Sequence, residues 1–489
     1  MYKYVSSLLF SASVFLVQTL PSQSISYQTG TTAEEKLIKQ SETMIFSAGS
    51  ENYFITTYYK DAYMHYNLIR YNNELALTKE TELTIPLGVM GNTTFIDDVV
   101  PLGINAYVLV EHLDKTAGAN TLSAHIINPM GNIAETETEL MSMPFEKVMN
   151  SGFNYASVSP DKNTLAVVGE MPFDKLLPAT FKISLYNTAL KKMNSTEITL
   201  PGENKRNKSI SVVVNNSGVV YLIKKSFTAN GETALSVYQY DALKGGDVKE
   251  YAIELAEPNY ITTYVYNINP NGQLMLGGTY YQRQTLSAGE TSAKGIFFFT
   301  NNNMSEKQLT AFDLEKPVSL LTTRKILLND NTIFLCAEVY KETREDLPAG
   351  STGFDYNYNY VHQGEYVIGL NTDGSKKFET NIPRDFTARN FDRQFYSGYY
   401  ICNGKLTLVC NDNTAKYIKD DIYHGYQIPI VMQIANDGSK QTPVVLKDNL
   451  KLEQGYMMYP GLSLQTNSKQ LLMLIGNGLF FKPLSLSIE

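Results

Sequence analysis

The sequence has no tryptophan, few cysteines and little charge. Its 489 residues include 3 cysteines, and 41 basic side chains stand against 49 acidic ones. An odd, sparse set of cysteines excludes a disulfide framework. The net charge of −8 argues against a nucleic-acid partner held by a basic surface. Glycine (32 residues) and proline (18) are too few for a disordered or collagen-like chain. We therefore expect a folded protein that binds no nucleic acid.

Long apolar runs are also absent, apart from a short one near the N-terminus. Residues 1–24 read as a signal peptide, because Lys3 precedes an apolar run at 5–17, and Ser22 and Ser24 suit a cleavage site. The run is shorter than the roughly 20 residues of a membrane-spanning helix, and no later stretch approaches that length. No cysteine follows the run, so a lipid anchor is not supported. We expect an exported protein without a transmembrane span, located in the periplasm, at the cell surface or outside the cell. The competing interpretation is an uncleaved N-terminal anchor.

What the sequence does contain is a repeat of short strands separated by Asn, Asp and Gly turns, which is typical of an all-β fold. In residues 155–200 a strand, a tight polar turn, a strongly apolar strand and two further strands follow one another. The order recurs in 211–255 and 261–314, with a period of about 60 residues. The units cover about 42–84, 95–140, 150–200, 207–255, 260–314, 318–383, 391–446 and 455–489.

The repeat resembles that of exported bacterial β-propellers of the YncE-like, TolB-like and WD40-like kind. Residues 159–167 (SPDKNTLAV) are similar to the S-P-D-G-K-x-L-A-V repeat of that group, with Lys162 where the pattern prefers glycine, and 269–274 (NPNGQL) is a looser match. The resemblance implies that residues 25–489 form a single propeller of seven to eight four-stranded antiparallel blades, and it implies no specific activity. Because the last unit is one strand short, an N-terminal strand near residues 24–28 is expected to close the ring. A tandem of β-sandwiches is the structural alternative.

Small residues recur at one equivalent position of the second strands. They are Gly169, Gly277, Cys336, Cys410 and Gly476. Small side chains there would let neighbouring blades approach closely, so we interpret Cys336 and Cys410 as buried packing residues. Cys402 precedes Asn403-Gly404, a hairpin signal, and is not expected to pair with Cys410.

The longest connections lie between the second and third strands of the units. They are residues 111–121, 170–180, 226–233, 280–294, 339–364 and 411–427. In an up-and-down blade these connections all emerge at one end of the propeller, and long loops on a rigid scaffold often carry function. The candidate ligand-binding residues on this face are Tyr280, Tyr281, Arg283, Tyr356, Tyr358, Tyr360, His362, Tyr417, Tyr423, His424 and Tyr426.

Tyrosine combines a broad apolar face with a hydroxyl, which suits protein, peptide or glycan ligands. It is also common in half-buried strands, where it only packs. The leading hypothesis is a non-enzymatic binding or scaffolding propeller. The alternatives are a hydrolase or lyase acting on an exported glycan or peptide at the channel mouth, and a subunit of a larger envelope assembly.

Catalytic and metal motifs are missing from the sequence. It contains no G-x-S-x-G, H-E-x-x-H, P-loop or EF-hand pattern. Sialidase-like and quinoprotein propellers use repeats that contain tryptophan, so its absence disfavours both. We predict no catalytic residue, no metal-binding residue and no cofactor. Calcium held by Asp420-Asp421 and residues 411–413 is a weak hypothesis, because the spacing lacks the regular form of a calcium loop.

Overall fold

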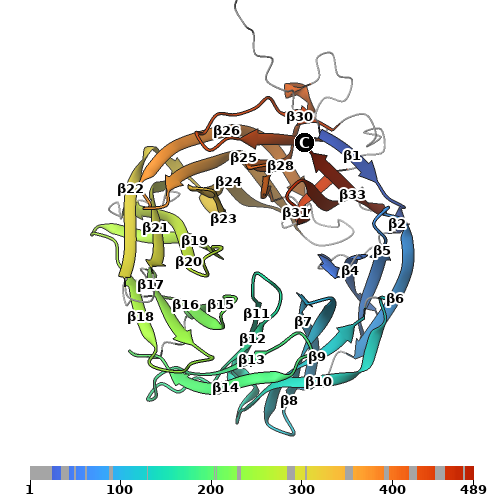
Figure 1. The fold of residues 1–489 in the computed structure, drawn as a ribbon, viewed down its shortest axis with the longest axis vertical. Helices are drawn as coiled ribbons and strands as arrows, with labels where there is room; N and C mark the ends of the chain where they lie inside the picture. Colours follow the sequence, from blue (N-terminus) through green and yellow to red (C-terminus); the bar gives the residue numbers. More distant parts are fainter. Residues whose placement is uncertain are drawn as a thin grey trace, which may run out of the picture.

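The fold of the chain consists almost entirely of strands. The structure is a computed structural model that describes residues 25–34, 43–48, 51–60, 63–86, 92–128, 130–202, 204, 206, 208–227, 233–282, 292–302, 306–346, 356–389, 396–417, 427–446, 457–476 and 480–489. Within these residues eight antiparallel sheets stand radially around one central axis (Figure 1). This confirms the predicted all-β propeller and gives it eight blades.

Blades one to seven run in chain order from the innermost strand to the rim, whereas in blade eight the N-terminal β1 lies outside β33. Blades one to four consist of β3 (Thr43–Ala48), β4 (Glu51–Lys60), β5 (Tyr63–Tyr71) and β6 (Leu77–Pro86); β7 (Asn92–Leu102), β8 (Asn105–Asp114), β9 (Ala119–Ile127) and β10 (Ile133–Pro144); β11 (Phe153–Val158), β12 (Leu165–Glu170), β13 (Thr180–Tyr186) and β14 (Lys192–Thr199); and β15 (Lys208–Val214), β16 (Val219–Phe227), β17 (Thr233–Asp241) and β18 (Lys249–Ile253). Blades five to eight consist of β19 (Asn259–Ile268), β20 (Leu274–Gln282), β21 (Ser292–Asn302) and β22 (Glu306–Ser319); β23 (Leu321–Asn329), β24 (Thr332–Asp346), β25 (Tyr356–Asn371) and β26 (Lys376–Arg389); β27 (Gly398–Cys402), β28 (Lys405–Asn413), β29 (Gln427–Ile434) and β30 (Val444–Val445); and β31 (Met457–Asn467), β32 (Gln470–Gly476) and β33 (Phe480–Ile488) with two N-terminal strands, β1 (Ile25–Thr29) and β2 (Ala33–Glu34). Two short 3₁₀ turns, Val148–Asn150 and Thr414–Lys416, complete the described elements.

The two ends of the chain close the ring in blade eight. The N-terminal β1 pairs antiparallel with the C-terminal β33, from Ile25 opposite Ile488 to Thr29 opposite Leu484. The expected closure by an N-terminal strand is therefore confirmed. It covers the edge of β33, which would otherwise expose unpaired backbone groups.

The apolar core lies between neighbouring blades. For example, Phe181 and Ile183 of blade three pack with Leu222 and Tyr238 of blade four in one buried cluster. Cys336 and Cys410 are buried in the cluster between blades six and seven. Both are free thiols, as is Cys402, which agrees with the packing role and with the absence of a Cys402–Cys410 bond.

Two turns show how the local sequence sets the backbone. Lys162 adopts φ +59° in the turn of residues 159–163, the left-handed conformation for which the related repeats use glycine. Asn403 and Gly404 have φ +54° and +69°, as expected for a two-residue hairpin between β27 and β28.

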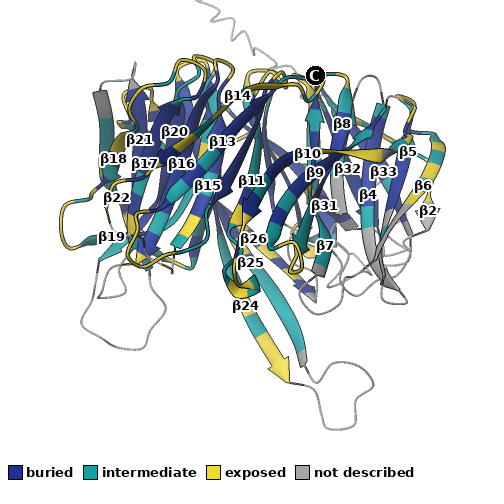
Figure 2. Cartoon of the chain, turned by 90° about the horizontal axis from the view of Figure 1, so that it is seen from below, coloured by how far each residue is buried: buried dark blue, intermediate teal, exposed yellow. Residues whose placement is uncertain are grey.

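The β24–β25 hairpin protrudes from one end of the propeller, well beyond the other blades (Figure 2). Residues 339–346 and 356–364 belong to these two strands, whereas the sequence interpretation treated 339–364 as one connection between strands. Residues 111–121 behave in the same way, because β8 continues to Asp114 and β9 begins at Ala119. The alternation of tyrosine with asparagine at 356–360 is a strand period, and it extends the ladder into the supposed loop.

Candidate functional site

Several predicted binding residues lie on one face of β25. Tyr358, Tyr360 and His362 alternate along the strand, so their side chains point to the same side of the hairpin. Tyr340 of β24 is the register partner of His362 and joins them on that side. Tyr356 holds the next position of the same alternation, outside the described side chains.

The aromatic rings of this face form a continuous set, which we call the tyrosine stripe: Tyr340, Tyr358, Tyr360 and Tyr396. The ring centroids of Tyr358 and Tyr360 are 6.2 Å apart, and those of Tyr360 and Tyr340 are 6.3 Å apart with planes within 9°. Tyr396, which precedes β27, meets Tyr340 edge-on at 5.4 Å. All four residues are half-buried, so the stripe presents aromatic surface while it remains anchored to the scaffold. Sequence reasoning missed Tyr396 and Tyr340, since neither lies in the Tyr-rich part of a long connection.

A half-buried arginine supports the inner end of the stripe. The guanidinium carbon of Arg324 on β23 lies 3.6 Å from the ring centroid of Tyr396 and 5.0 Å from that of Tyr340. A cation over an aromatic face at this range contributes about 0.5–2 kcal/mol. Arg324 therefore fixes both rings and places positive charge beside them.

Three other predicted residues, Tyr280, Tyr281 and Tyr417, are not part of this group. Tyr280 is 2% exposed and donates its hydroxyl to Asp313 at 2.7 Å. Tyr281 is half-buried, with its ring centroid 5.8 Å from that of Tyr260. Tyr417 is half-buried and donates to Asp412 Oδ2 at 2.7 Å. Arg283, Tyr423, His424 and Tyr426 lie outside the described residues.

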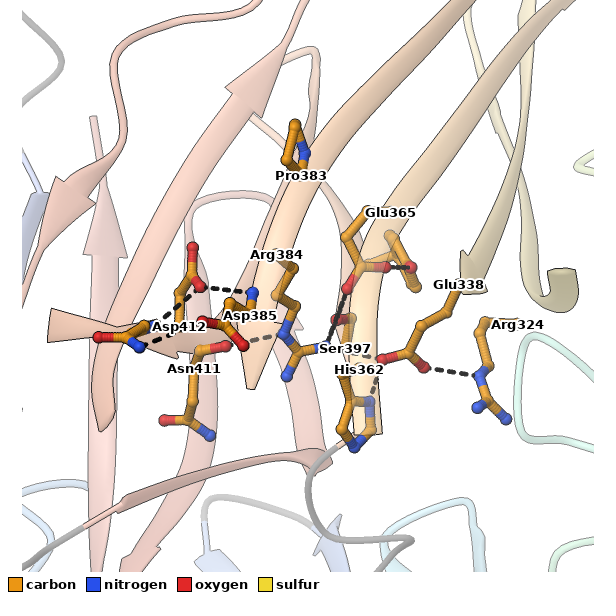
Figure 3. A network of polar contacts seen from close by, with 12 residues as sticks. Arg324, Glu338, His362, Glu365, Pro383, Arg384, Asp385, Ser397, Asn411 and Asp412 are labelled. Atoms are coloured by element: carbon orange, nitrogen blue, oxygen red, sulfur yellow. Dashed lines mark hydrogen bonds and ion pairs between the residues drawn. The ribbon is translucent and has the colours of Figure 1, made fainter. Parts of the chain in front are cut away.

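A network of buried charges lies at the root of the protruding hairpin, between blades six and seven (Figure 3). At its centre Arg384 of β26 directs Nη1 toward two carboxylates, with Glu338 Oε1 at 2.7 Å and Glu365 Oε1 at 2.8 Å. Both carboxylates are 0% exposed. Glu338 also accepts hydrogen bonds from Arg324 Nε at 2.9 Å and from His362 Nδ1.

Further contacts tie the network to blade seven. Glu365 accepts hydrogen bonds from Ser397 at 2.6 Å and from the Tyr399 hydroxyl. Arg384 Nε donates to the carbonyl oxygen of Asn411 on β28 at 2.7 Å. Strands of two blades are therefore joined by charge-assisted hydrogen bonds, which are about twice as strong as neutral ones.

The two carboxylates titrate in opposite directions. Burial would raise the pKa of Glu338, but the hydrogen bond from His362 and the charges of Arg384 and Arg324 outweigh burial and lower this pKa to about 2. Burial, followed by the negative charge of Glu338, raises the pKa of Glu365 to about 7 despite Arg384. Divergent carboxylate pKa values can mark an acid–base pair. Here, however, both groups are enclosed and share one arginine nitrogen, so the arrangement stabilises the junction of two blades.

Replacing Glu365 with glutamine is expected to change how stability depends on pH. Because the folded-state pKa is raised above the ordinary value of 4.5, the folded protein holds an extra proton between the two values. Binding of that proton stabilises the folded state, and the stabilisation is therefore lost as pH rises from about 4.5 to 7. At about 1.4 kcal/mol per pKa unit, the wild-type loss is on the order of 3 kcal/mol. Glu365→Gln should lack this pH-dependent loss. The free energy of unfolding of the variant minus that of the wild type, measured by urea unfolding, should therefore rise between pH 5 and pH 8.

The exposed Glu345 on the same hairpin provides the matched control. Glu345→Gln should give a pH profile parallel to that of wild type. Asp97, whose pKa burial raises to about 7, titrates in the same range in every variant and cancels in the comparison. Parallel profiles for wild type and Glu365→Gln would contradict the assigned proton.

The calcium hypothesis finds little support in the described part of residues 411–427. Asp412 is 0% exposed and is already bound by Lys416 Nζ at 2.9 Å and by Tyr417. The Asn413 side chain accepts from the Ala415 backbone and begins a 3₁₀ turn. No three His, Cys, Asp or Glu residues gather into a metal site among the described residues. Asp420 and Asp421 lie outside them.

Comparisons with known proteins agree on the fold and go no further. No protein-family model matches the sequence, and no curated protein matches it. The structure is similar to the WD40 domain of SCAP from fission yeast (9% identity, TM-score 0.40, 94% of each chain covered). It is also similar to the β-propeller domain of the Trilobed protease from Pyrococcus furiosus (9%, 0.34, 82% of this chain and 95% of that one) and to an alpha-L-arabinanase from Penicillium chrysogenum (10%, 0.34, 64% and 94%). The eight sheets of the structure make the protein an eight-bladed β-propeller, and the similarities to known structures support no statement about activity or ligand.

A helix that could cross a membrane is not found among the described residues.

Proposed function

We propose that this protein is an exported, non-enzymatic binding propeller that captures a protein, peptide or glycan ligand on the tyrosine stripe. The observation that carries the proposal is the protruding β24–β25 hairpin with a row of half-buried tyrosine rings along one side. Tyrosine supplies contact area at low cost in conformational entropy and adds a hydroxyl for hydrogen bonding. The signal-peptide pattern of residues 1–24 supports export, and with it a location in the periplasm, at the cell surface or outside the cell.

The shape of the hairpin also favours binding. A two-stranded hairpin that extends beyond its sheet loses the packing of neighbouring blades, and isolated hairpins are only marginally stable in water. The described outer residues of β24, from Glu342 to Asp346, are mostly exposed. They contribute little to the core, so the protruding part of the hairpin offers surface for a partner rather than stability to the fold.

The alternative of a hydrolase or lyase would need two carboxylates about 5–10 Å apart on either side of a substrate. Among the described residues, Glu338 and Glu365 form a close pair, and both are fully enclosed. Asp97 and Glu111 also interact electrostatically; both are half-buried, and burial raises the pKa of each. Asp412, which lies in the 411–427 connection, is bound by Lys416 and Tyr417. Binding is therefore the function that the geometry favours.

Shortening the hairpin tests the proposal. Glu342 and Tyr360 are register partners, so an Asn-Gly turn in place of residues 343–359 joins them in a two-residue hairpin. The change removes Tyr358 and the tip, and leaves the buried network untouched. Because the described residues it removes are not buried, the melting temperature should change by about 2 °C or less. Ligands should bind at least about tenfold more weakly.

The full chain and the shortened variant should be screened against the same glycan array and the same random-peptide display library. Ligands selected on the full chain that fail on the variant would support the proposal. Ligands that bind both proteins with equal affinity would place the binding surface elsewhere and contradict it. A matched Thr343→Ser variant, which keeps the hairpin, should bind like the wild type.

A further inference from the structure

Two nitrogen atoms at the inner end of the tyrosine stripe have no hydrogen-bond partner among the described residues. They are Arg324 Nη2 and His362 Nε2, and both atoms are buried. Unsatisfied buried polar atoms are rare in folded proteins because each costs about 1–3 kcal/mol. Two such atoms, on residues that bond to the same carboxylate, call for a group that completes them.

The same carboxylate orients both residues. Arg324 Nε and His362 Nδ1 each bond to Glu338, one to each carboxylate oxygen. The remaining nitrogens of both residues therefore point away from Glu338, and Figure 3 shows them directed to the same side. Glu338 is itself held by Arg384, so the two free positions are fixed by the scaffold.

The chemistry of the two atoms is complementary. His362 Nδ1 faces a carboxylate and carries the proton, so Nε2 of the neutral ring keeps a lone pair and accepts a hydrogen bond. Burial lowers the pKa of His362, in agreement with a neutral ring. Arg324 Nη2 can only donate. A carboxylate or phosphate would satisfy the arginine and leave the histidine lone pair facing another acceptor. A hydroxyl satisfies both, because it accepts from one and donates to the other.

Aromatic rings flank these atoms. The His362 ring centroid lies 5.3 Å from that of Tyr340 and 6.2 Å from that of Tyr396. From Tyr340 the stripe continues outward through Tyr360 to Tyr358. The faces of these rings carry partial negative charge and attract positively polarised edges, such as the C–H groups of a pyranose ring.

We propose that the tyrosine stripe binds a neutral oligosaccharide, with one sugar hydroxyl held between Arg324 Nη2 and His362 Nε2 and the adjoining sugar rings packed on Tyr340, Tyr360 and Tyr358. This inference rests on the proposed function and selects the glycan among its ligand classes. The hydroxyl site fixes which sugar unit of the oligosaccharide lies on which tyrosine ring, while the tyrosines supply the contact area.

Isothermal titration calorimetry with the full chain tests the inference. The probes are cello-, xylo-, manno-, malto- and chito-oligosaccharides, with oligogalacturonate as the acidic comparison. At least one neutral probe should bind, and Tyr358→Ala should weaken it at least about tenfold. Tyr266→Ala provides the control, because Tyr266 is an exposed tyrosine of blade five and its loss should leave the affinity unchanged.

The hydroxyl contact has its own test. Arg324→Lys keeps a cation beside Glu338 and removes the forked nitrogen, so the best neutral probe should bind about 10- to 100-fold more weakly. Monodeoxy versions of that probe should identify one hydroxyl whose removal costs the wild type at least about tenfold and costs Arg324→Lys little. A loss of folding in the lysine variant would not produce this selective pattern.

The outcomes separate the inference from the proposed function. Peptides that bind the stripe while no neutral oligosaccharide does would overturn the glycan inference and leave the binding function standing. Oligogalacturonate binding more tightly than every neutral probe would also overturn it, because an anion would then occupy the site. Oligosaccharide binding unchanged in both Tyr358→Ala and the shortened hairpin would overturn both. An ordered water between Arg324 and His362, kept in a crystal structure with bound oligosaccharide, would overturn the hydroxyl contact.

Discussion

Replacing Arg384 with methionine is expected to lower the free energy of unfolding at pH 7 by about 3–5 kcal/mol, the usual cost of removing one partner from a buried ion pair. Arg384 is 4% exposed and is shared by Glu338 and Glu365 through one nitrogen. Methionine keeps an unbranched apolar stem that reaches about as far as Nε of arginine, and it leaves two enclosed carboxylates facing each other. Their repulsion, rather than a cavity, should dominate the loss.

The pH dependence distinguishes repulsion from simple loss of packing. Arg384 holds the pKa of Glu365 below the value that burial and Glu338 would set, so this pKa should rise further in Arg384→Met. A carboxyl group that stays protonated in the folded state stabilises it below that pKa, and the stabilisation is lost as pH rises. The cost of the substitution should therefore be smallest near pH 5 and grow toward pH 8, as measured by urea unfolding followed by circular dichroism.

The double variant Glu365→Gln/Arg384→Met completes a double-mutant cycle with the two single variants. It removes one positive and one negative charge and leaves Glu338 paired with Arg324 and His362. Its loss should be about 1–3 kcal/mol smaller than the sum of the single losses. The exposed Arg344 of the same hairpin gives a control, and Arg344→Met should cost about 0.5 kcal/mol or less. Additive losses in the cycle would show that Arg384 and Glu365 do not interact.

The fold was predictable because its determinants are local and repeated. The Asn-Gly turn at 403–404 and the polar turn at 159–163 mark strand boundaries within a few residues. The repeat period then fixes how many such units the chain can hold. The missing strand of the last unit pointed to an N-terminal partner, and β1 occupies that place on β33. The structure was needed to decide between seven and eight blades, and to show that strands extend into residues 111–121 and 339–364.

The site was only partly predictable, since its main contacts are long-range. Glu338 and Glu365 stand singly within the apolar strands β24 and β25, and each is surrounded by buried residues. A carboxylate in such a run signals a buried charge that needs a partner. That partner, Arg384, was not identifiable, because its pairing depends on the register of β26 against β25, which is irregular between His362 and Gly364. The tyrosines at 356–360 were found, but their strand alternation was taken for loop composition.

Removing β1 is expected to destabilise the whole ring. Its five residues pair with β33 in continuous register, and Ile25 and Tyr27 pack on the cluster between blades seven and eight. Each ladder hydrogen bond contributes about 1 kcal/mol net. With the lost apolar contacts, a chain that starts at Gly30 should be less stable than one that starts at Ile25 by about 4–6 kcal/mol. The exposed edge of β33 should also promote self-association, which sedimentation velocity would detect.

A synthetic peptide of residues 24–31 provides the control for this prediction. If the loss comes from the vacant edge, the peptide should add a strand to β33 and restore both the melting temperature and the monomer, as strand addition does in other sheets. A peptide with the same composition in scrambled order should not, since Ile25 and Tyr27 must face the cluster between blades seven and eight. If the chain that starts at Gly30 had the same melting temperature as the one that starts at Ile25, ring closure by β1 would contribute nothing to stability. Rescue by the native peptide and not by the scrambled one would show instead that the N-terminal strand stabilises the propeller by closing the ring.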